Sequence, residues 1–183
     1  MNLFRHQVKN LITADLTGID TTTQRAIFYY HNLADATYST GAEIATALIL
    51  FQNLTANIND YLLSPKTGSN STLPYVKRLG INYSLTYRFP QWQMEFNTTG
   101  EVNGPMLTSA LGPDGAPDYR DSPVYSVLNF RLAKEIGIFR LALGVNNIGD
   151  FRQPPVTAQH NEYYWGPLIG REFYGTASVN LEK

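Results

Sequence analysis

The chain has 183 residues, a formal net charge of -1 and no cysteine. This length suits one domain, and the lack of cysteine excludes a disulfide framework or a thiolate metal site. Lys and Arg are scattered without a basic stripe, so we expect no nucleic-acid partner. Tyrosine is abundant, with 12 copies, and its amphipathic ring suits boundaries between apolar and wet surroundings.

The first half of the chain alternates between apolar and polar residues over three stretches, which is the pattern of β-strands with two different faces. In the first stretch Phe4 and Val8 share one face, while Arg5 and Gln7 share the other. In chain order the expected segments are a strand over 4–12, a loop over 16–24, a strand over 25–48, a tight turn near 49–52, a strand over 52–62 and a loop over 65–74.

The second half contains the clearest alternation. Apolar residues recur at every second position from Leu79 to Phe89, and after Pro90 and Gln91 the pattern continues over 92–99. These two stretches predict a hairpin with an apolar outer face and a charged inner face. The segments that follow are a long loop over 104–123, a strand over 124–133, a turn over 134–137, a strand over 138–147, a long loop, and a last strand that alternates over 172–181.

The predicted fold class is therefore all-β and antiparallel, with about eight strands whose connections alternate between short and long. Outer-membrane barrels pair short periplasmic turns with long extracellular loops. The alternation also fits a soluble fold, whose apolar face would be core and whose polar face would meet solvent. Three features favour a transmembrane barrel: the apolar face persists over all eight segments, aromatic residues gather near several strand ends, and charged residues lie on the inner face.

Two motifs flank the last long loop. The strand before it ends in Val-Asn-Asn-Ile-Gly-Asp at 145–150, and the last strand opens with Gly-Arg-Glu-Phe-Tyr at 170–174. Both resemble the C-terminal end of the TonB-dependent outer-membrane receptors, whose penultimate strand ends in Asn-Leu-Phe-Asp or a near variant. The resemblance assigns structural roles, at the junction of strand and loop or towards lipid, to Asn146, Asn147, Asp150, Gly170, Arg171 and Phe173.

This resemblance implies that the chain is the last part, about eight strands, of a 22-stranded barrel in the bacterial outer membrane, in contact with outer-membrane lipid. In that family an N-terminal plug closes the barrel, and a short box before the plug recruits TonB, which supplies energy. The imported nutrient is scarce, for example an iron chelate, haem, cobalamin or a glycan. The expected partners are then the plug, the remaining barrel strands, TonB and a small nutrient ligand.

Residues 1–183 contain neither a plug nor a TonB box, and residues 1–5 lead directly into a strand without the charged region, apolar core and cleavage site of a secretory leader. We therefore expect residues 1–183 to be the C-terminal portion of a longer receptor barrel.

No catalytic constellation is found in the sequence: the zinc-protease, phosphate-loop, dinucleotide and nucleophile-elbow motifs do not occur. The histidines His6, His31 and His160 lie in separate segments without the spacing of a metal pair. We therefore expect no enzyme, no cofactor and no metal site.

The last long loop is the best candidate for ligand contact. His160, Tyr163, Tyr164 and Trp165 combine an imidazole that can bind a metal or haem with an aromatic platform. In the preceding long loop, Tyr119 and Arg120 form a second candidate of the same kind. The alternative interpretation of these residues is an interfacial aromatic girdle beside a solvated loop.

Two other functions stay open from the sequence. One is a complete eight-stranded outer-membrane barrel with an adhesion or structural role, because eight strands close a small barrel that side chains fill. The other is a soluble β-sandwich or lipocalin-like binding module.

Overall fold

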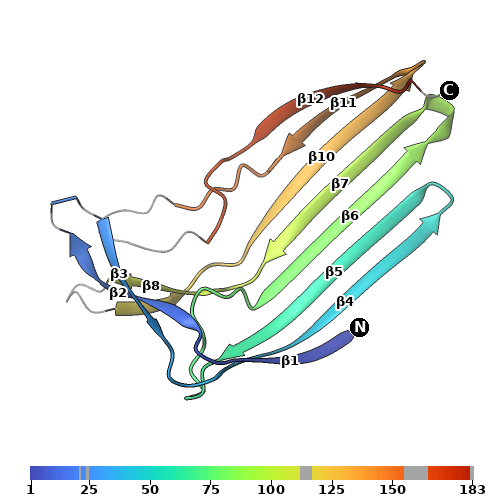
Figure 1. The fold of residues 1–183 in the computed structure, drawn as a ribbon. Helices are drawn as coiled ribbons and strands as arrows, with labels where there is room; N and C mark the ends of the chain where they lie inside the picture. The colour runs from blue at the N-terminus through green and yellow to red at the C-terminus, as the bar shows by residue number, and fades with distance from the viewer. Residues whose placement is uncertain (21, 24, 112–116, 155–164, 182–183) are drawn as a thin grey trace.

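In the computed structural model, which describes residues 1–20, 22–23, 25–111, 117–154 and 165–181, the chain forms a curved antiparallel sheet of eight strands (Figure 1). In spatial order the strands are β1 (Asn2–Val8), β4 (Thr37–Phe51), β5 (Leu54–Lys66), β6 (Leu79–Phe89), β7 (Met94–Asn103), β10 (Tyr125–Ile136), β11 (Phe139–Asn146) and β12 (Glu172–Val179). The expected all-β antiparallel fold with about eight strands is confirmed.

The sheet is open. β1 and β12 lie at its two edges and do not pair with each other in the described part of the chain (Figure 1). A closed eight-stranded barrel and a sandwich of two stacked sheets are therefore not the observed folds. No helix among the described residues is long and apolar enough to cross a membrane.

Two small hairpins extend beyond one end of the sheet (Figure 1). β2 (Ile12–Asp20) pairs with β3 (Arg25–Asn32), and β8 (Leu107–Leu111) pairs with β9 (Pro117–Asp121). The expected loops over 16–24 and 104–123 are thus partly strands. The expected strand over 25–48 is two strands, because β3 takes β2 as its partner while β4 pairs with β1 and β5. Hairpins that leave the sheet need no continuous apolar face, so apolar alternation does not mark them.

Tight turns join the strands at the other end of the sheet. After β6, the short 3-10 helix η1 (Pro90–Trp92) ends at Gln93, whose φ of 50° reverses the chain into β7. Between β10 and β11, Gly137 has a φ of 61°, a conformation that glycine adopts without a steric cost. The short turns expected near residues 91 and 135 lie here, opposite the long loops.

The strand register gives the sheet one apolar and one polar face. In the β6–β7 pair, Tyr87 lies opposite Phe96 on the apolar face, and Arg88 lies opposite Glu95 on the polar face. The same face assignment continues across β5, β10, β11 and β12 because directly paired residues point to the same side. Phe173 of β12 is on the apolar face and is 79% exposed in the isolated chain. An apolar face this exposed needs an apolar environment.

β1 departs from the expected arrangement. The expectation of a continuous apolar outer face is wrong for this strand, because Phe4 pairs with Gly41 on the polar face of the sheet and Arg5 pairs with Thr40 on the apolar face. Gly41 leaves room for the Phe4 ring, which a Cβ at residue 41 would meet at 2.7 Å. Packing against this glycine therefore outweighs the alternation of the β1 sequence.

The described residues contain few fully buried side chains. Among them the buried apolar residues are Pro65, Met106, Tyr125, Ala133, Ala142 and Trp165. Met106, Tyr125 and Trp165 form one cluster at the loop end of the sheet. A single curved sheet whose apolar face is exposed cannot form a larger internal core.

Candidate functional site

A cavity of about 410 Å³ lies among the segments at the loop end. It is lined by residues of the β2–β3 hairpin, the loop between β5 and β6, and the β8–β9 hairpin. Four hydroxyl side chains line it together with the Asp15 carboxylate, Tyr119 and several apolar residues. A cavity of this size can hold a small molecule, and its few polar groups can fix the orientation of that molecule.

Tyr119 and Asp15 supply the electrostatics of this loop cavity. Partial burial raises the pKa of the Tyr119 phenol, and the charges of Asp15 and Tyr75 raise that pKa further. Tyr119 therefore remains a neutral hydrogen-bond donor at neutral pH. The Asp15 carboxylate lies 3.5 Å from His31 Nδ1, so the pair is ionic only when the imidazole is protonated.

The sequence-predicted contact residues have different positions. Tyr119 lines the loop cavity, whereas Arg120 turns to Asp118, whose Oδ2 accepts a hydrogen bond from Arg120 Nε at 2.7 Å. His160, Tyr163 and Tyr164 lie outside the described residues. Trp165 is only 6% exposed and belongs to the buried aromatic cluster.

At the junction of β11 with the last loop, Asn147 joins the two ends of that loop. This residue is 5% exposed, and its φ of 51° is a conformation that asparagine tolerates. Its side-chain Nδ2 donates to the carbonyls of Phe151 at 2.7 Å and Ile169 at 3.3 Å, and its Oδ1 accepts from the Phe151 N–H at 3.0 Å. Its own N–H donates to Asn129 Oδ1 at 2.8 Å. Asn147 thus fastens the loop to strand β10.

Asp150 makes the second connection across the loop. Its Oδ1 accepts hydrogen bonds from the Arg171 N–H at 2.7 Å and from Arg152 Nη2 at 3.0 Å. These bonds, the Arg171 one first, hold the pKa of the Asp150 carboxyl below its usual range. Gly170 suits this junction, because a Cβ at residue 170 would meet Asp150 Oδ1 and the Arg152 guanidinium, and both side chains would have to move. Arg171 Nε donates to the Ile148 carbonyl at 3.0 Å.

Four motif residues, Asn147, Asp150, Gly170 and Arg171, therefore meet in one hydrogen-bonded junction. Asn146 lies outside it, exposed at the end of β11 and opposite Glu172 of β12.

Aromatic rings pack above this junction on the polar face of β10. The rings of Tyr125 and Phe151 are stacked with centroids 5.0 Å apart, and Trp165 lies 5.6 Å from Tyr125. Lys77 Nζ approaches the Tyr125 hydroxyl at 3.3 Å. The buried Gln153 Oε1 accepts from the Trp165 N–H at 2.7 Å. The described parts of the last loop, residues 147–154 and 165–171, thus pack against the polar side of the sheet.

Sequence reasoning missed Gln153, Lys77 and Tyr125 as members of this cluster. The alternation places Tyr125 correctly on the polar face of its strand, and an aromatic residue on such a face is the only signal that could have marked it. Gln153 and Lys77 lie in loops where no sequence motif marks them.

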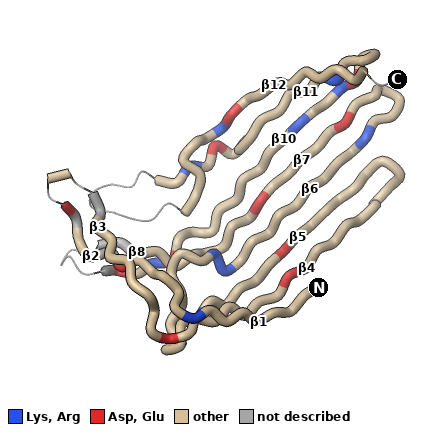
Figure 2. Tube along the Cα trace, in the orientation of Figure 1, with Lys and Arg blue, Asp and Glu red and all other residues tan. Residues whose placement is uncertain are grey.

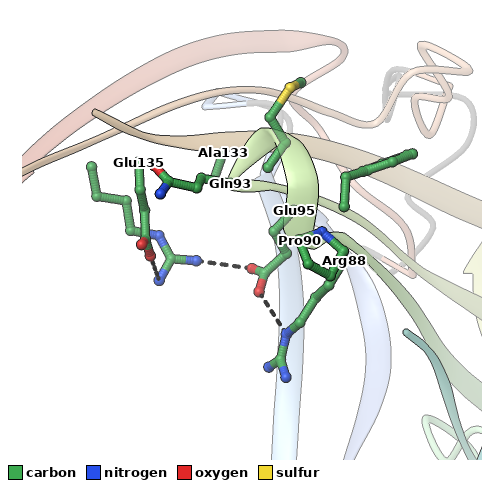
Figure 3. Close-up of a pocket in the computed structure, with 9 residues that line it drawn as sticks. Arg88, Pro90, Gln93, Glu95, Ala133 and Glu135 are labelled. Atoms are coloured by element: carbon green, nitrogen blue, oxygen red, sulfur yellow. Dashed lines mark hydrogen bonds and ion pairs between the residues drawn. The ribbon is translucent and has the colours of Figure 1, made fainter. Parts of the chain in front are cut away.

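Near the tight turns, a group of ion pairs lies on the polar face. Glu95, whose side chain is 22% exposed, lies 2.9 Å from Arg140 Nη2, 3.4 Å from Arg88 Nε and 3.5 Å from Arg131 Nη1. Glu135 lies 4.0 Å from Arg140. Figure 3 shows Arg88 pointing towards Glu95 beside a cavity of about 400 Å³. This Glu95 cluster has three cations and two carboxylates, so it carries an excess positive charge.

The sequence profile of the family described as TonB dependent receptor-like, beta-barrel matches residues 1–148. The chain belongs to this TonB-dependent receptor family. The family consists of outer-membrane receptors and not of enzymes. A comparison with curated proteins found no match.

Several solved receptor structures share the fold of this TonB-dependent receptor segment. FpvA of P. aeruginosa in complex with a ferric pyoverdine superposes with a TM-score of 0.69 at 11% identity, over 96% of this chain and 24% of that one. The FrpB iron transporter of Neisseria meningitidis gives 0.64 at 15% identity, over 96% and 27%. The ferric-catecholate import receptor Fiu of E. coli K12 gives 0.65 at 16% identity, over 97% and 24%. The chain spans about a quarter of the receptors it matches.

Membership in this family indicates what surrounds each face of the sheet. As a wall segment of a TonB-dependent receptor barrel in the bacterial outer membrane, the sheet turns its apolar face to lipid and its polar face to the lumen. The tight turns are then periplasmic, and the hairpins and long loops are extracellular. The Glu95 cluster accordingly lies in the periplasmic part of the lumen, and the loop cavity lies on the extracellular side.

Proposed function

We propose that residues 1–183 form the C-terminal portion of the barrel of a receptor that imports a small nutrient with energy supplied by TonB. The observation that carries this proposal is the two-faced sheet itself. Its lipid face is predominantly apolar from β5 to β12, its lumen face holds ion pairs, and its extracellular end holds a cavity of ligand size. These are the three requirements of a wall that both spans the membrane and meets a solute.

The remaining barrel strands are the first proposed partner. β1 pairs with residues 37–43 of β4 only, so among the described residues the edge of β4 from Ile44 to Phe51 has no neighbour on that side. In the described part of the chain β12 likewise pairs with β11 alone. Unpaired backbone groups in hydrocarbon cost several kcal/mol each, so both edges need further strands.

The isolated 183-residue chain, refolded into detergent micelles, should therefore fail to give a compact band that slows only after boiling. Addition of the remaining strands and the plug should restore that band on a heat-modifiability gel. A compact band from the isolated chain would contradict the wall-segment proposal.

A plug is the second proposed partner, and the Glu95 cluster supports it. In the lumen, Arg88 is well exposed and Arg140 Nε is buried without a hydrogen-bond partner in the described structure. Such donors are stabilised by acceptors from another segment inside the barrel. A plug that fills the lumen would supply those acceptors.

The loop cavity is the proposed nutrient contact, with Tyr119 and Asp15 as its orienting groups. An iron chelate is the first candidate class, because structures similar to this chain include a ferric pyoverdine complex and a ferric-catecholate import receptor. Haem, cobalamin and a glycan are the other classes to be tested. In the last loop, His160, Tyr163 and Tyr164 stay predicted contacts, whereas burial gives Trp165 a packing role first.

The test is uptake by cells that carry the intact receptor as their only importer for each labelled nutrient. We expect one iron chelate to enter only when both the receptor and TonB are present. Tyr119→Ala should raise the KM for that chelate about ten-fold, equivalent to about 1.4 kcal/mol of binding, with unchanged receptor abundance.

Tyr30→Ala is the matched control, because Tyr30 is 68% exposed on β3 and does not line the cavity. Equal KM values for the Tyr119 variant and the native receptor would mean that the loop cavity does not contact the transported nutrient. Uptake that persists without TonB would overturn the importer proposal itself.

A further inference from the structure

The lipid face changes from apolar to polar within one register row across β1, β4 and β5. The last apolar row across these strands and β6 is Leu3, Ala42, Leu62 and Leu79. The next row on the same face is Arg5, Thr40 and Ser64, and the one beyond it is Gln7, Tyr38 and Lys66. Rows on one face are two residues apart along each strand, about 7 Å. One row towards the periplasm, Asp60 is a charged exception between Ile44 and Ile81. We place the hydrocarbon boundary of the outer leaflet between Leu62 and Ser64, where the face turns polar on all three strands.

Four side chains of these two polar rows form an outer basic patch, which we define as Arg5, Gln7, Tyr38 and Lys66. The Arg5 guanidinium lies over the Tyr38 ring, 4.7 Å from its centroid. Gln7 Nε2 approaches the Tyr38 hydroxyl at 3.5 Å. Tyr38 thus holds the β1 residues in place, and amphipathic rings of this kind belong at the level of lipid headgroups.

Lys66 stands on the other side of Tyr38. Its Nζ donates to Thr72 Oγ1 at 3.3 Å, and residues 66 and 72 are also joined by a β-bridge. The ammonium group is therefore positioned by a neighbouring loop and keeps two further N–H donors for another acceptor.

Neither cation of the patch is neutralised by the described residues. No ion pair joins Arg5 or Lys66 to a carboxylate in this part of the structure, and the exposed Asp35, in the loop beside Gly68, pairs with neither. On the same face of β5, Asp60 lies three rows from Lys66 towards the periplasm, about 20 Å along the strand. The patch is a pair of unpaired cations on a lipid-facing surface, at the height where headgroups begin.

We propose that the outer basic patch binds the phosphate groups of a phosphorylated lipid headgroup in the outer leaflet. Arg5 offers a planar guanidinium and Lys66 offers a point charge, which are the two kinds of donor that phosphate oxygens accept. Thr72, which Lys66 contacts, lines the loop cavity, but none of the four patch residues lines it. The patch continues directly from the lipid-contacting row on the lipid face, so we assign its occupant to the membrane lipid and not to the transported nutrient.

The test measures lipid binding by the intact receptor, purified in a neutral detergent and titrated with lipid A in native mass spectrometry. The double variant Arg5→Gln with Lys66→Gln should weaken binding of lipid A that carries both phosphates about thirty-fold, at about five-fold for each basic residue near a charged membrane surface. Lipid A without phosphates should bind the native receptor and the variant equally. The charge-conserving pair Arg5→Lys with Lys66→Arg should retain most of the affinity.

Lys134→Gln is the matched control. Lys134 lies on the same lipid face but at the periplasmic end, opposite Met94 and Leu141. It should leave lipid A affinity unchanged, and heat-modifiable migration should show that all variants remain folded. Equal binding by the double variant, or an equal loss in the Lys134 variant, would overturn the proposal. Binding of inorganic phosphate with the same dependence on Arg5 and Lys66 would assign the patch to free phosphate instead of lipid.

Discussion

The extracellular end and the periplasmic end of this sheet are stabilised by different interactions. At the extracellular end, Tyr125 and Trp165 are buried, and Asn147 and Gln153 satisfy the backbone of a long loop. At the periplasmic end, the connections are tight turns, and the largest group of side-chain contacts is the Glu95 cluster. Figure 2 shows positions of both charge signs distributed along the strands of the sheet.

The difference follows from the length of the connections. A tight turn satisfies its backbone within a few residues, whereas a long loop must find partners for many N–H and C=O groups away from any strand. In the described parts of the last loop, the side-chain amides of Asn147 and Gln153 are such partners, and aromatic rings pack beside them. We therefore expect the stability of the extracellular end to depend on packing and that of the periplasmic end to depend on charge. Three measurements test this difference.

The largest effect is expected from Tyr125→Ala. This substitution removes the ring that touches both Phe151 and Trp165, and large-to-small changes of buried aromatic residues cost about 3 to 5 kcal/mol. The last loop should lose amide hydrogen-exchange protection, and the temperature at which the folded band of the intact receptor disappears should fall. The loss should depend little on salt concentration, because the ring contacts with Phe151 and Trp165 are apolar and the Lys77 ammonium adds one polar contact with the Tyr125 hydroxyl at 3.3 Å.

Tyr30→Ala serves as the control for ring size at an exposed position and should change the free energy of unfolding by less than about 0.5 kcal/mol. If the Tyr125 variant keeps the native protection of residues 165–171, the aromatic cluster does not hold the loop, and the proposed difference between the two ends is wrong.

A smaller and salt-dependent effect is expected from Glu95→Gln. The change leaves three guanidinium groups facing each other, and for a partly exposed carboxylate the loss should lie near 1 to 3 kcal/mol, between the values for exposed and buried pairs. High salt should destabilise the native periplasmic end slightly but should stabilise the variant, because ions screen the repulsion among the arginines. Thermal unfolding of the intact receptor and of the variant, each at low and high salt, measures both effects of salt on stability.

Glu135→Gln is the matched control, since Glu135 is mostly exposed and lies 4.0 Å from a single arginine. Its effect should stay below about 1 kcal/mol. If high salt lowered the stability of the Glu95 variant as it lowers that of the native protein, the arginines would not repel each other. The cluster would then not be stabilised by electrostatic interactions.

Much of the fold could be predicted because the membrane imposes a strong pattern. β6 and β7 were predicted closely, since every second residue must suit lipid and the residues between must suit water. The β2–β3 and β8–β9 hairpins were missed because they extend beyond the sheet, where no apolar face is needed. β1 was assigned the wrong outer face because its partner strand offers Gly41 as a site for Phe4.

The candidate sites were predictable only where a motif marked them. The residues around Asn147 and Gly170 stood in a family motif, and the structure brings them into one junction. Tyr119 could be predicted only as an aromatic residue in a long loop. Its position in a cavity depends on three segments that are distant in sequence. The outer basic patch was not predictable, because its residues come together through the register of β1, β4 and β5.

The smallest effect concerns acid at the extracellular junction. The pKa of Asp150 is lowered from 3.8, first by the Arg171 N–H and then by Arg152. A carboxyl with a lowered folded-state pKa stabilises the fold fully above its unfolded pKa, and this contribution is lost as the pH falls through the lower folded value. The hydrogen-exchange protection factors of residues 168–174, in which the fall of the intrinsic exchange rate in acid is corrected for, should therefore stay high down to about pH 4 and decrease below it.

Asp150→Asn should remove this acid-induced step, because an amide does not titrate in that range, while the amide oxygen of the variant can still accept a hydrogen bond from the Arg171 N–H. Asp20→Asn is the matched control. Asp20 also has a lowered pKa, from its bonds to Thr23 and Thr22, but it lies in the β2–β3 hairpin, so its loss should leave the step in residues 168–174 intact. If the Asp20 variant abolished the step, or if the Asp150 variant kept it, acid would be acting on the junction through another group, and the hydrogen bond of Asp150 would not be what closes the last loop.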